Sequence, residues 1–121
     1  GVAVSLDIRV TNVSLDIDSA VPCGLIINEL ISNSLKHGFV GRQGIGTIVV
    51  KFSQVEGRYV LHIRDDGIGL PAGFDVHAAL TMGMEIVSIL TQQLDGEITF
   101  ESNGGARFEV SFPQKLKHHD V

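Results

Sequence analysis

The sequence is poor in several features, and each absence limits what the chain can be. A single cysteine, Cys23, excludes an internal disulfide, so a reducing, cytoplasmic setting is expected. No apolar run reaches the roughly 18 residues that span a membrane, and no secretory leader is visible. The nine basic residues form no run, and the net charge is −5. We therefore expect a domain that contacts neither nucleic acid nor membrane, although its parent protein could still be membrane-anchored.

The residues that are present indicate a globular domain. Hydrophobic residues make up 44% of the chain, too many for a disordered segment. The 121 residues suit one domain with a real core. We expect residues 1–113 to form this domain and residues 114–121 to form a polar tail. Because the chain opens at Gly1 without a methionine, we expect it to be a domain of a longer protein.

Hydrophobic periodicity predicts a mixed α/β order. Alternating residues predict strands at 2–10 and 13–17, and helical spacing predicts a helix from about Ala20 to His37, ended by Gly38. A second helix is expected from Gly83 to about residue 94. Further strands are predicted at 47–52, 59–64, 97–102 and 107–112, the first two joined by a turn at Glu56-Gly57. The simplest arrangement of these elements is a two-layer structure in which helices cover one face of a sheet.

The first predicted helix gathers polar groups on one face. At about 100° per residue, four apolar residues share an arc that is expected to face the sheet: Ile27, Leu30, Ile31 and Leu35. The opposite side carries Glu29, Ser32, Asn33 and Lys36. A plain solvated face is the alternative, but asparagine is a poor helix former, and this helix has two. Glu29 and Asn33 are one turn apart and can reach one point. The Asn33 amide oxygen would suit magnesium, which keeps waters and phosphates as other ligands.

A second group of polar residues follows the predicted strand at 59–64. The segment reads Asp65-Asp66-Gly67-Ile68-Gly69. The Asp65 carboxylate could accept a hydrogen bond from the amino group of a purine. Gly67 and Gly69 would let the backbone approach a flat ring. An ordinary Asp-Gly turn is the alternative.

A third segment, Met82-Gly83-Met84, places a glycine just before a helix. Free backbone amides at a helix start, together with the helix dipole, can hold phosphate. A plain loop-to-helix junction would look the same. The order and spacing of the three segments together favour a site for a magnesium–nucleotide complex.

These segments resemble the motifs of the GHKL ATPases, a superfamily that includes DNA gyrase, the MutL repair proteins, heat-shock chaperones and histidine kinases. Residues 28–37 are similar to the N box of that superfamily, residues 65–69 to the G1 box and residues 82–84 to the G2 box. Residues 104–113 resemble the closing strand of histidine-kinase catalytic domains. The resemblance runs from about Val4 to Pro113.

The resemblance implies a Bergerat-type two-layer α/β sandwich, with a mixed sheet covered on one face by helices and a lid within Leu70–Met82. Asn33 would bind Mg²⁺, and Asp65 would bind the adenine amino group of ATP. The remaining nucleotide contacts are implied for His37, Gly67, Gly69, Gly83 and Met84. Glu29 and Lys36 are the candidate catalytic residues.

Three positions depart from the family pattern. Ala106 stands where many relatives carry threonine, which helps to hold adenine through water. No Lys or Arg occurs between Arg64 and Arg107, so the lid carries no cation for the γ-phosphate. Glu29 replaces the asparagine of most histidine kinases.

The leading hypothesis is the catalytic domain of a two-component sensor histidine kinase. It would bind Mg²⁺-ATP and pass the γ-phosphoryl group to a histidine on a separate dimerisation domain, with a response regulator downstream. None of the histidines of this chain lies in a segment that resembles the acceptor motif. The chain alone should therefore show little activity.

Two alternatives remain open from the sequence. The N box also resembles that of anti-sigma-factor serine kinases, in which Glu29 would act as the base that activates a partner serine. A non-catalytic, kinase-like binding module is the second alternative, which the absence of a lid cation keeps open.

Overall fold

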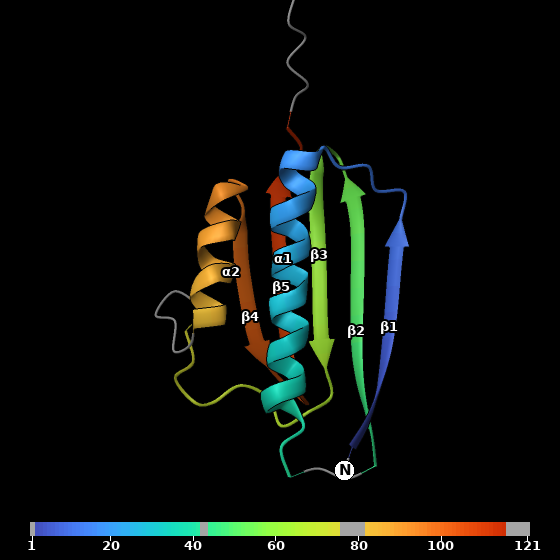
Figure 1. Ribbon diagram of the computed structural model, residues 1–121, viewed down its shortest axis with the longest axis vertical. Coiled ribbons are helices and arrows are strands. Elements are labelled where there is room, and N and C mark those ends of the chain that lie inside the picture. The colour runs from blue at the N-terminus through green and yellow to red at the C-terminus, as the bar shows by residue number, and fades with distance from the viewer. Residues whose placement is uncertain (1, 42–43, 76–81, 116–121) are drawn as a thin grey trace, which may run out of the picture.

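The computed structural model describes residues 2–41, 44–75 and 82–115, and in these ranges it is a two-layer α/β sandwich. One layer is a five-stranded sheet, and the helices cover one of its faces (Figure 1). The elements, in chain order, are β1 (Val2–Thr11), α1 (Ile17–Asn33), a π-helical turn η1 (Ser34–Gly38), β2 (Gly44–Val55), β3 (Arg58–Asp65), α2 (Met82–Gln93), β4 (Glu97–Ser102) and β5 (Ala106–Pro113). The expected fold class is confirmed.

The sheet is mixed, with strand order β1-β2-β3-β5-β4. β1 runs parallel to β2, and the other neighbours are antiparallel. Parallel neighbours need a crossover connection, and α1 with η1 forms it. β2 and β3 are joined by Glu56 (φ 49°) and Gly57 (φ 79°). Positive φ at both positions matches the sheet twist in a two-residue hairpin, so the predicted turn is confirmed.

Helix α1 differs from its prediction in its first residue and in the residues that it buries. It begins at Ile17 rather than near Ala20, because the backbone oxygen of Asp16 accepts hydrogen bonds from the Ser19 and Ala20 amides at 3.1 and 2.9 Å. The residues of α1 buried toward the sheet are Ser19, Cys23, Ile26 and Leu30.

The residues that α1 buries against the sheet are only partly those predicted to face it. Ile27 and Ile31 are only half-buried, and the side chain of Leu35 is 51% exposed. The arc was drawn through the apolar residues alone, whereas small polar residues such as Ser19 and Ser34 occupy part of the buried side.

The strand predicted at 13–17 was wrong. Residues 12–16 form an irregular connection from β1 to α1, which begins where Asn12 adopts a positive φ of 44°. The Tyr59 hydroxyl donates a hydrogen bond to the Ser14 carbonyl and holds this connection against the sheet. Val13 and Leu15 pack against the core from the connection, which accounts for their alternating pattern without a strand.

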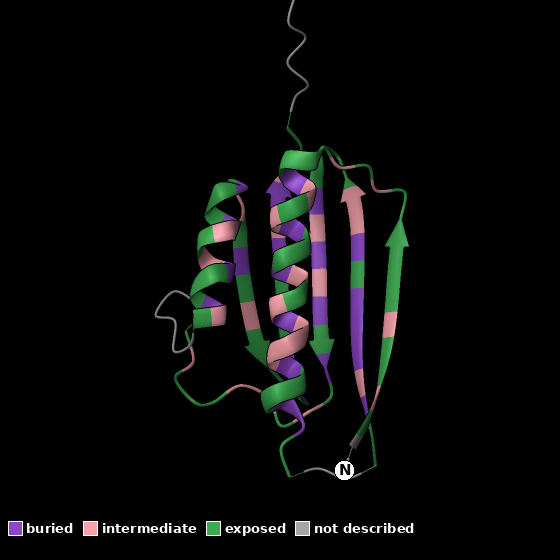
Figure 2. Ribbon diagram, in the orientation of Figure 1, coloured by how far each residue is buried: buried purple, intermediate pink, exposed green. Residues whose placement is uncertain are grey.

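The core lies between the helices and the central strands, as the buried positions in Figure 2 show. The rings of Phe52, Tyr59 and Phe112 cluster at one end, with centroids 5.1–6.4 Å apart. β1 forms one edge of the sheet, and no helix lies over it in Figure 1. Its side chains Leu6, Ile8 and Val10 are therefore 48–59% exposed. None of the described helices is long and apolar enough to cross a membrane.

Cys23 provides a test of the packing of α1. Its side chain is 2% exposed, and burial raises the pKa of the thiol to about 11. Because the thiolate is the reactive form, Cys23 of the folded protein should react with iodoacetamide at pH 8 far more slowly than Cys23 in denaturant. Mass spectrometry of the alkylated protein over time measures both rates. Equal rates would mean that α1 does not cover the sheet as described.

Candidate functional site

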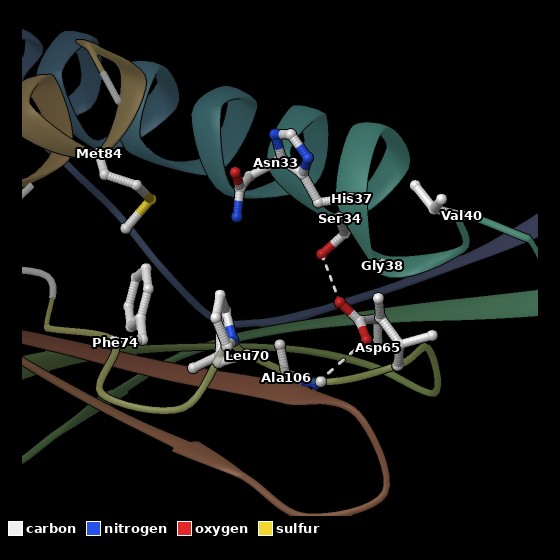
Figure 3. A pocket seen from close by; sticks show the side chains of 13 residues that line it. Asn33, Ser34, His37, Gly38, Val40, Asp65, Leu70, Phe74, Met84 and Ala106 are labelled. Atoms are coloured by element: carbon white, nitrogen blue, oxygen red, sulfur yellow. Dashed lines mark hydrogen bonds between the residues drawn. The ribbon is translucent and has the colours of Figure 1, made fainter. Parts of the chain in front are cut away.

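A buried carboxylate at the end of β3 organises the site. Asp65 is 7% exposed, and both of its oxygens already have hydrogen-bond donors. The Ser34 hydroxyl donates to Oδ2 at 2.7 Å. The backbone amides of Gly67 and Ala106 donate to Oδ1 at 2.9 and 3.1 Å. The carboxylate thus joins η1, the loop after β3 and the start of β5 (Figure 3).

The loop after β3 lies directly against η1, and a glycine makes this approach possible. The Ile68 amide donates to the Gly38 carbonyl at 2.7 Å. A Cβ on Gly67 would lie 2.0 Å from that same carbonyl oxygen, closer than any real contact. A side chain at position 67 would therefore push the loop away from η1.

A second glycine, Gly69, fixes the direction of the loop. Its φ is 85°, a region that side-chain-bearing residues rarely adopt. A Cβ there would lie 2.3 Å from the Ser102 Oγ, which itself accepts a hydrogen bond from the Leu70 amide at 3.0 Å. The loop after β3 is therefore held on one side by η1 and on the other by the end of β4.

These contacts enclose a cavity of about 530 Å³ whose polar end is Asp65 (Figure 3). A cavity of this size suits a small-molecule ligand. Its lining is mainly apolar and comes from η1, the loop after β3, α2 and β5. The lining residues are Asn33, Ser34, His37, Gly38, Val40, Asp65, Ile68, Gly69, Leu70, Pro71, Phe74, Met84 and Ala106.

A second, polar hollow of about 270 Å³ adjoins the first between α1 and the start of α2. The two share Asn33, His37 and Met84, so together they form one continuous site. The lining residues of this hollow are Glu29, Ser32, Asn33, Lys36, His37, Met82, Gly83 and Met84. One end of the site is therefore apolar with a carboxylate, and the other carries an amine, an amide and the first turn of a helix.

The structure brings together nearly all of the residues singled out from the sequence. Glu29, Lys36 and Gly83 line the polar hollow, and Asp65 and Gly69 line the apolar cavity. The three predicted residues that line both parts are Asn33, His37 and Met84. Gly67 is the exception, because it lies behind the cavity wall against Gly38 rather than in the lining.

The oxygen atoms of the polar hollow could bind a magnesium ion only if a bound nucleotide and waters supplied most of its coordination. Within residues 2–41, 44–75 and 82–115, no group of three or more His, Cys, Asp or Glu side chains could hold a metal. The hollow does offer the Asn33 amide and the Glu29 carboxylate. One or two protein oxygens completed by phosphates and waters is a common arrangement for magnesium.

Ser34 was not among the residues singled out from the sequence. Ser34 follows Asn33 in the chain, but only the tertiary contact with Asp65, 31 residues away, reveals its place. The Phe74 ring packs edge-on against Phe100 and Phe108, with centroids 5.2 and 6.2 Å apart. The first part of the expected lid is thus anchored to the sheet, while residues 76–81 of it lie outside the described residues.

Comparison with known proteins agrees with this geometry. A family described as histidine kinase-, DNA gyrase B- and HSP90-like ATPase matches residues 19–116. The sensor histidine kinase PdtaS of Mycolicibacterium smegmatis is 31% identical over 101 residues, which are 79% of this chain and 20% of that protein. The sensor histidine kinase ComP of Bacillus subtilis is 29% identical over 103 residues, or 85% of this chain and 13% of ComP. The chain therefore spans a fifth or less of the length of these two relatives.

A solved structure shares the fold over nearly the whole chain. The histidine kinase domain of the Erythrobacter litoralis blue-light-activated kinase EL346 superposes with a TM-score of 0.86 at 25% identity, covering 93% of this chain and 52% of that one. The family match covers far more than half of the sequence and includes most of α1, the loop after β3 and α2. The chain therefore belongs to the histidine kinase-, DNA gyrase B- and HSP90-like ATPase family, and its relatives in that family include sensor histidine kinases.

Proposed function

We propose that this domain binds Mg²⁺-ATP across the two joined cavities and serves as the phosphoryl donor of a histidine kinase. The main support for the proposal is the buried Asp65 carboxylate in the wall of a mainly apolar cavity. A flat, apolar purine ring with one amino group matches this end. The nucleotide's phosphates would then extend toward the polar hollow.

The polar hollow would hold the phosphates and the metal. The Asn33 amide oxygen would be the protein ligand of Mg²⁺, and the metal would neutralise phosphate charge during transfer. The Lys36 amine and the backbone amides of Gly83 and Met84 would face the phosphate oxygens. His37, which lines both parts, would lie beside the ribose or the first phosphate.

The phosphoryl acceptor would be a histidine on a separate dimerisation domain, and a response regulator would take the group from that histidine. Support comes from the names of the relatives, which are sensor histidine kinases several times longer than this chain. In this scheme the present domain positions the γ-phosphate and supplies charge neutralisation, while the nucleophile comes from elsewhere.

A serine kinase of the same superfamily is the second candidate, favoured by the place of Glu29. This carboxylate is half-buried and lines the polar hollow together with Lys36. It could therefore take the proton of an incoming hydroxyl. Phosphohistidine is labile in acid whereas phosphoserine is stable there, so acid treatment of the phosphorylated full-length protein or its partner separates the two candidates.

Calorimetric titration of the domain with ATP, with and without Mg²⁺, tests the proposal itself. We expect saturable binding at one site per chain, with ATP bound more tightly when Mg²⁺ is present. Absence of ATP binding under both conditions would instead favour a non-catalytic, kinase-like module.

Asn33→Ala tests the metal ligand. If Asn33 contacts Mg²⁺, the variant should lose the gain in affinity that Mg²⁺ gives, while its affinity for metal-free ATP changes little. Asn28→Ala is the matched control, because Asn28 is exposed on the same helix and lines neither cavity. Equal losses with and without Mg²⁺ would mean that Asn33 supports the helix rather than the metal.

Asp65→Asn tests the contact with the base. The substitution keeps the shape but replaces an acceptor oxygen with a donor that would oppose the adenine amino group. The cost should be about 1.5–3 kcal/mol, or roughly ten- to a hundred-fold in ATP affinity. Asp95→Asn, at the far end of α2, removes the same charge outside the site and should leave the affinity unchanged.

The native domain offers an independent check of the same contact that needs no variant. GTP carries a carbonyl where ATP carries the amino group, and that carbonyl would face the Asp65 carboxylate. GTP should therefore bind far more weakly than ATP in competition calorimetry. Comparable affinities for the two nucleotides would contradict the assignment of Asp65.

A further inference from the structure

The hydrogen-bond partners of Asp65 differ in kind, and one of them is a side chain. Gly67 and Ala106 donate through backbone amides rather than through side chains. Ser34 donates through its hydroxyl, at 2.7 Å. Ser34 is 5% exposed and is the first residue of η1, so its hydroxyl has little room to turn elsewhere.

The three donors are divided unevenly between the two carboxylate oxygens. A carboxylate has about four acceptor positions, two on each oxygen. Both positions on Oδ1 are used by the two backbone amides. One position on Oδ2 is used by Ser34, which leaves the second position on Oδ2 for a ligand.

The Ser34 oxygen itself has only lone pairs left to offer, because its proton is donated to Asp65. Ser34 and Asp65 both line the apolar cavity, and Figure 3 shows them meeting at one end of it. At that end, Asp65 Oδ2 and Ser34 Oγ can therefore only accept hydrogen bonds from a ligand. An N–H donor on a ligand is matched there, whereas a carbonyl oxygen meets two lone-pair-bearing oxygens.

We propose that Ser34 is a positioning residue that sets the base specificity of this site by fixing the rotation of the Asp65 carboxylate. This inference rests on the proposed function, because it concerns the nucleotide that the cavity takes. Without the hydroxyl, none of the described residues donates to Oδ2, and they hold the carboxylate through Oδ1 alone. Its free acceptor position then no longer points in one direction.

The test compares nucleotides that differ at position 6 of the purine ring: ATP with an amino group, purine riboside triphosphate with hydrogen alone, and inosine triphosphate with an oxygen and, in addition, a proton on N1. In Ser34→Ala, ATP should bind roughly tenfold more weakly, as expected for one hydrogen bond to a charged group. Binding of purine riboside triphosphate should change by less than about twofold, since it makes no bond to Asp65. The preference for ATP over inosine triphosphate should shrink accordingly.

Two further variants separate positioning from mere structural support. Ser34→Cys keeps nearly the same volume but is a weak donor, so it should reproduce the selective loss of ATP binding, and its melting temperature should fall no further than that of Ser34→Ala. In an Asp65→Asn background, Ser34→Ala should cause little additional loss of ATP affinity, because the two residues act as a unit. Ser53→Ala, on β2 and outside both cavities, is the control and should leave all three affinities as they are.

Each outcome decides the inference. Equal losses for ATP and purine riboside triphosphate, or additive losses in the double variant, would overturn it while leaving ATP binding by the native domain intact. Failure of the native domain to bind any of the three nucleotides would overturn the proposed function, and this inference with it.

Discussion

The hydrogen bonds to Asp65 are the constraint on which the rest of the site depends. They tie the end of β3 to η1 and to the start of β5, three segments that are distant in sequence. A hydrogen bond to a charged group stabilises by about 1.5–3 kcal/mol, and a buried carboxylate without such partners would be strongly unfavourable. The same bonds that stabilise the burial also aim the carboxylate into the cavity before any ligand arrives.

Direct backbone contact between η1 and the loop after β3 forms one wall of the cavity. The Gly38 carbonyl meets the Ile68 amide at 2.7 Å, and Gly67 leaves room for that contact. The π-helical turn η1 widens the end of α1, a feature often found at functional sites. It turns Ser34 and Gly38 inward, and both are buried, while Lys36 and His37 remain exposed.

The chemistry of the site changes along its length, and this gradient matches a nucleotide. The cavity that contains Asp65 is lined mainly by apolar groups, whereas the hollow at the start of α2 is lined by Glu29, Asn33 and Lys36. Asn33 at the end of α1 lines both regions, and hydrogen bonds hold Asp65 at the end of β3. The spacing of base and phosphates would therefore be set by fixed elements of the fold. Rigid positioning of this kind is what phosphoryl transfer requires from a protein.

Much of this could be predicted from the sequence, for identifiable reasons. The hairpin of β2 and β3 and its Glu56-Gly57 turn follow from local alternation and turn chemistry, and the grouping of Asn33, Asp65 and Gly83 follows from motif order. The strand predicted at 13–17 failed, because side-chain alternation cannot show whether a neighbouring strand is available for pairing. The sheet-facing arc of α1 was misplaced, because hydrophobicity alone does not reveal buried serines. Ser34 was missed for the same reason: its significance comes from a contact across 31 residues.

The central claim is that the Asp65 carboxylate is the acceptor for the amino group of a bound adenine. A crystal structure of the domain with Mg²⁺ and a non-hydrolysable ATP analogue tests it most directly. The account predicts the adenine ring in the 530 Å³ cavity, with its amino nitrogen within about 3.2 Å of Asp65 Oδ2. A nucleotide bound with its base outside this cavity, or with its amino group turned away from Asp65, would contradict the account.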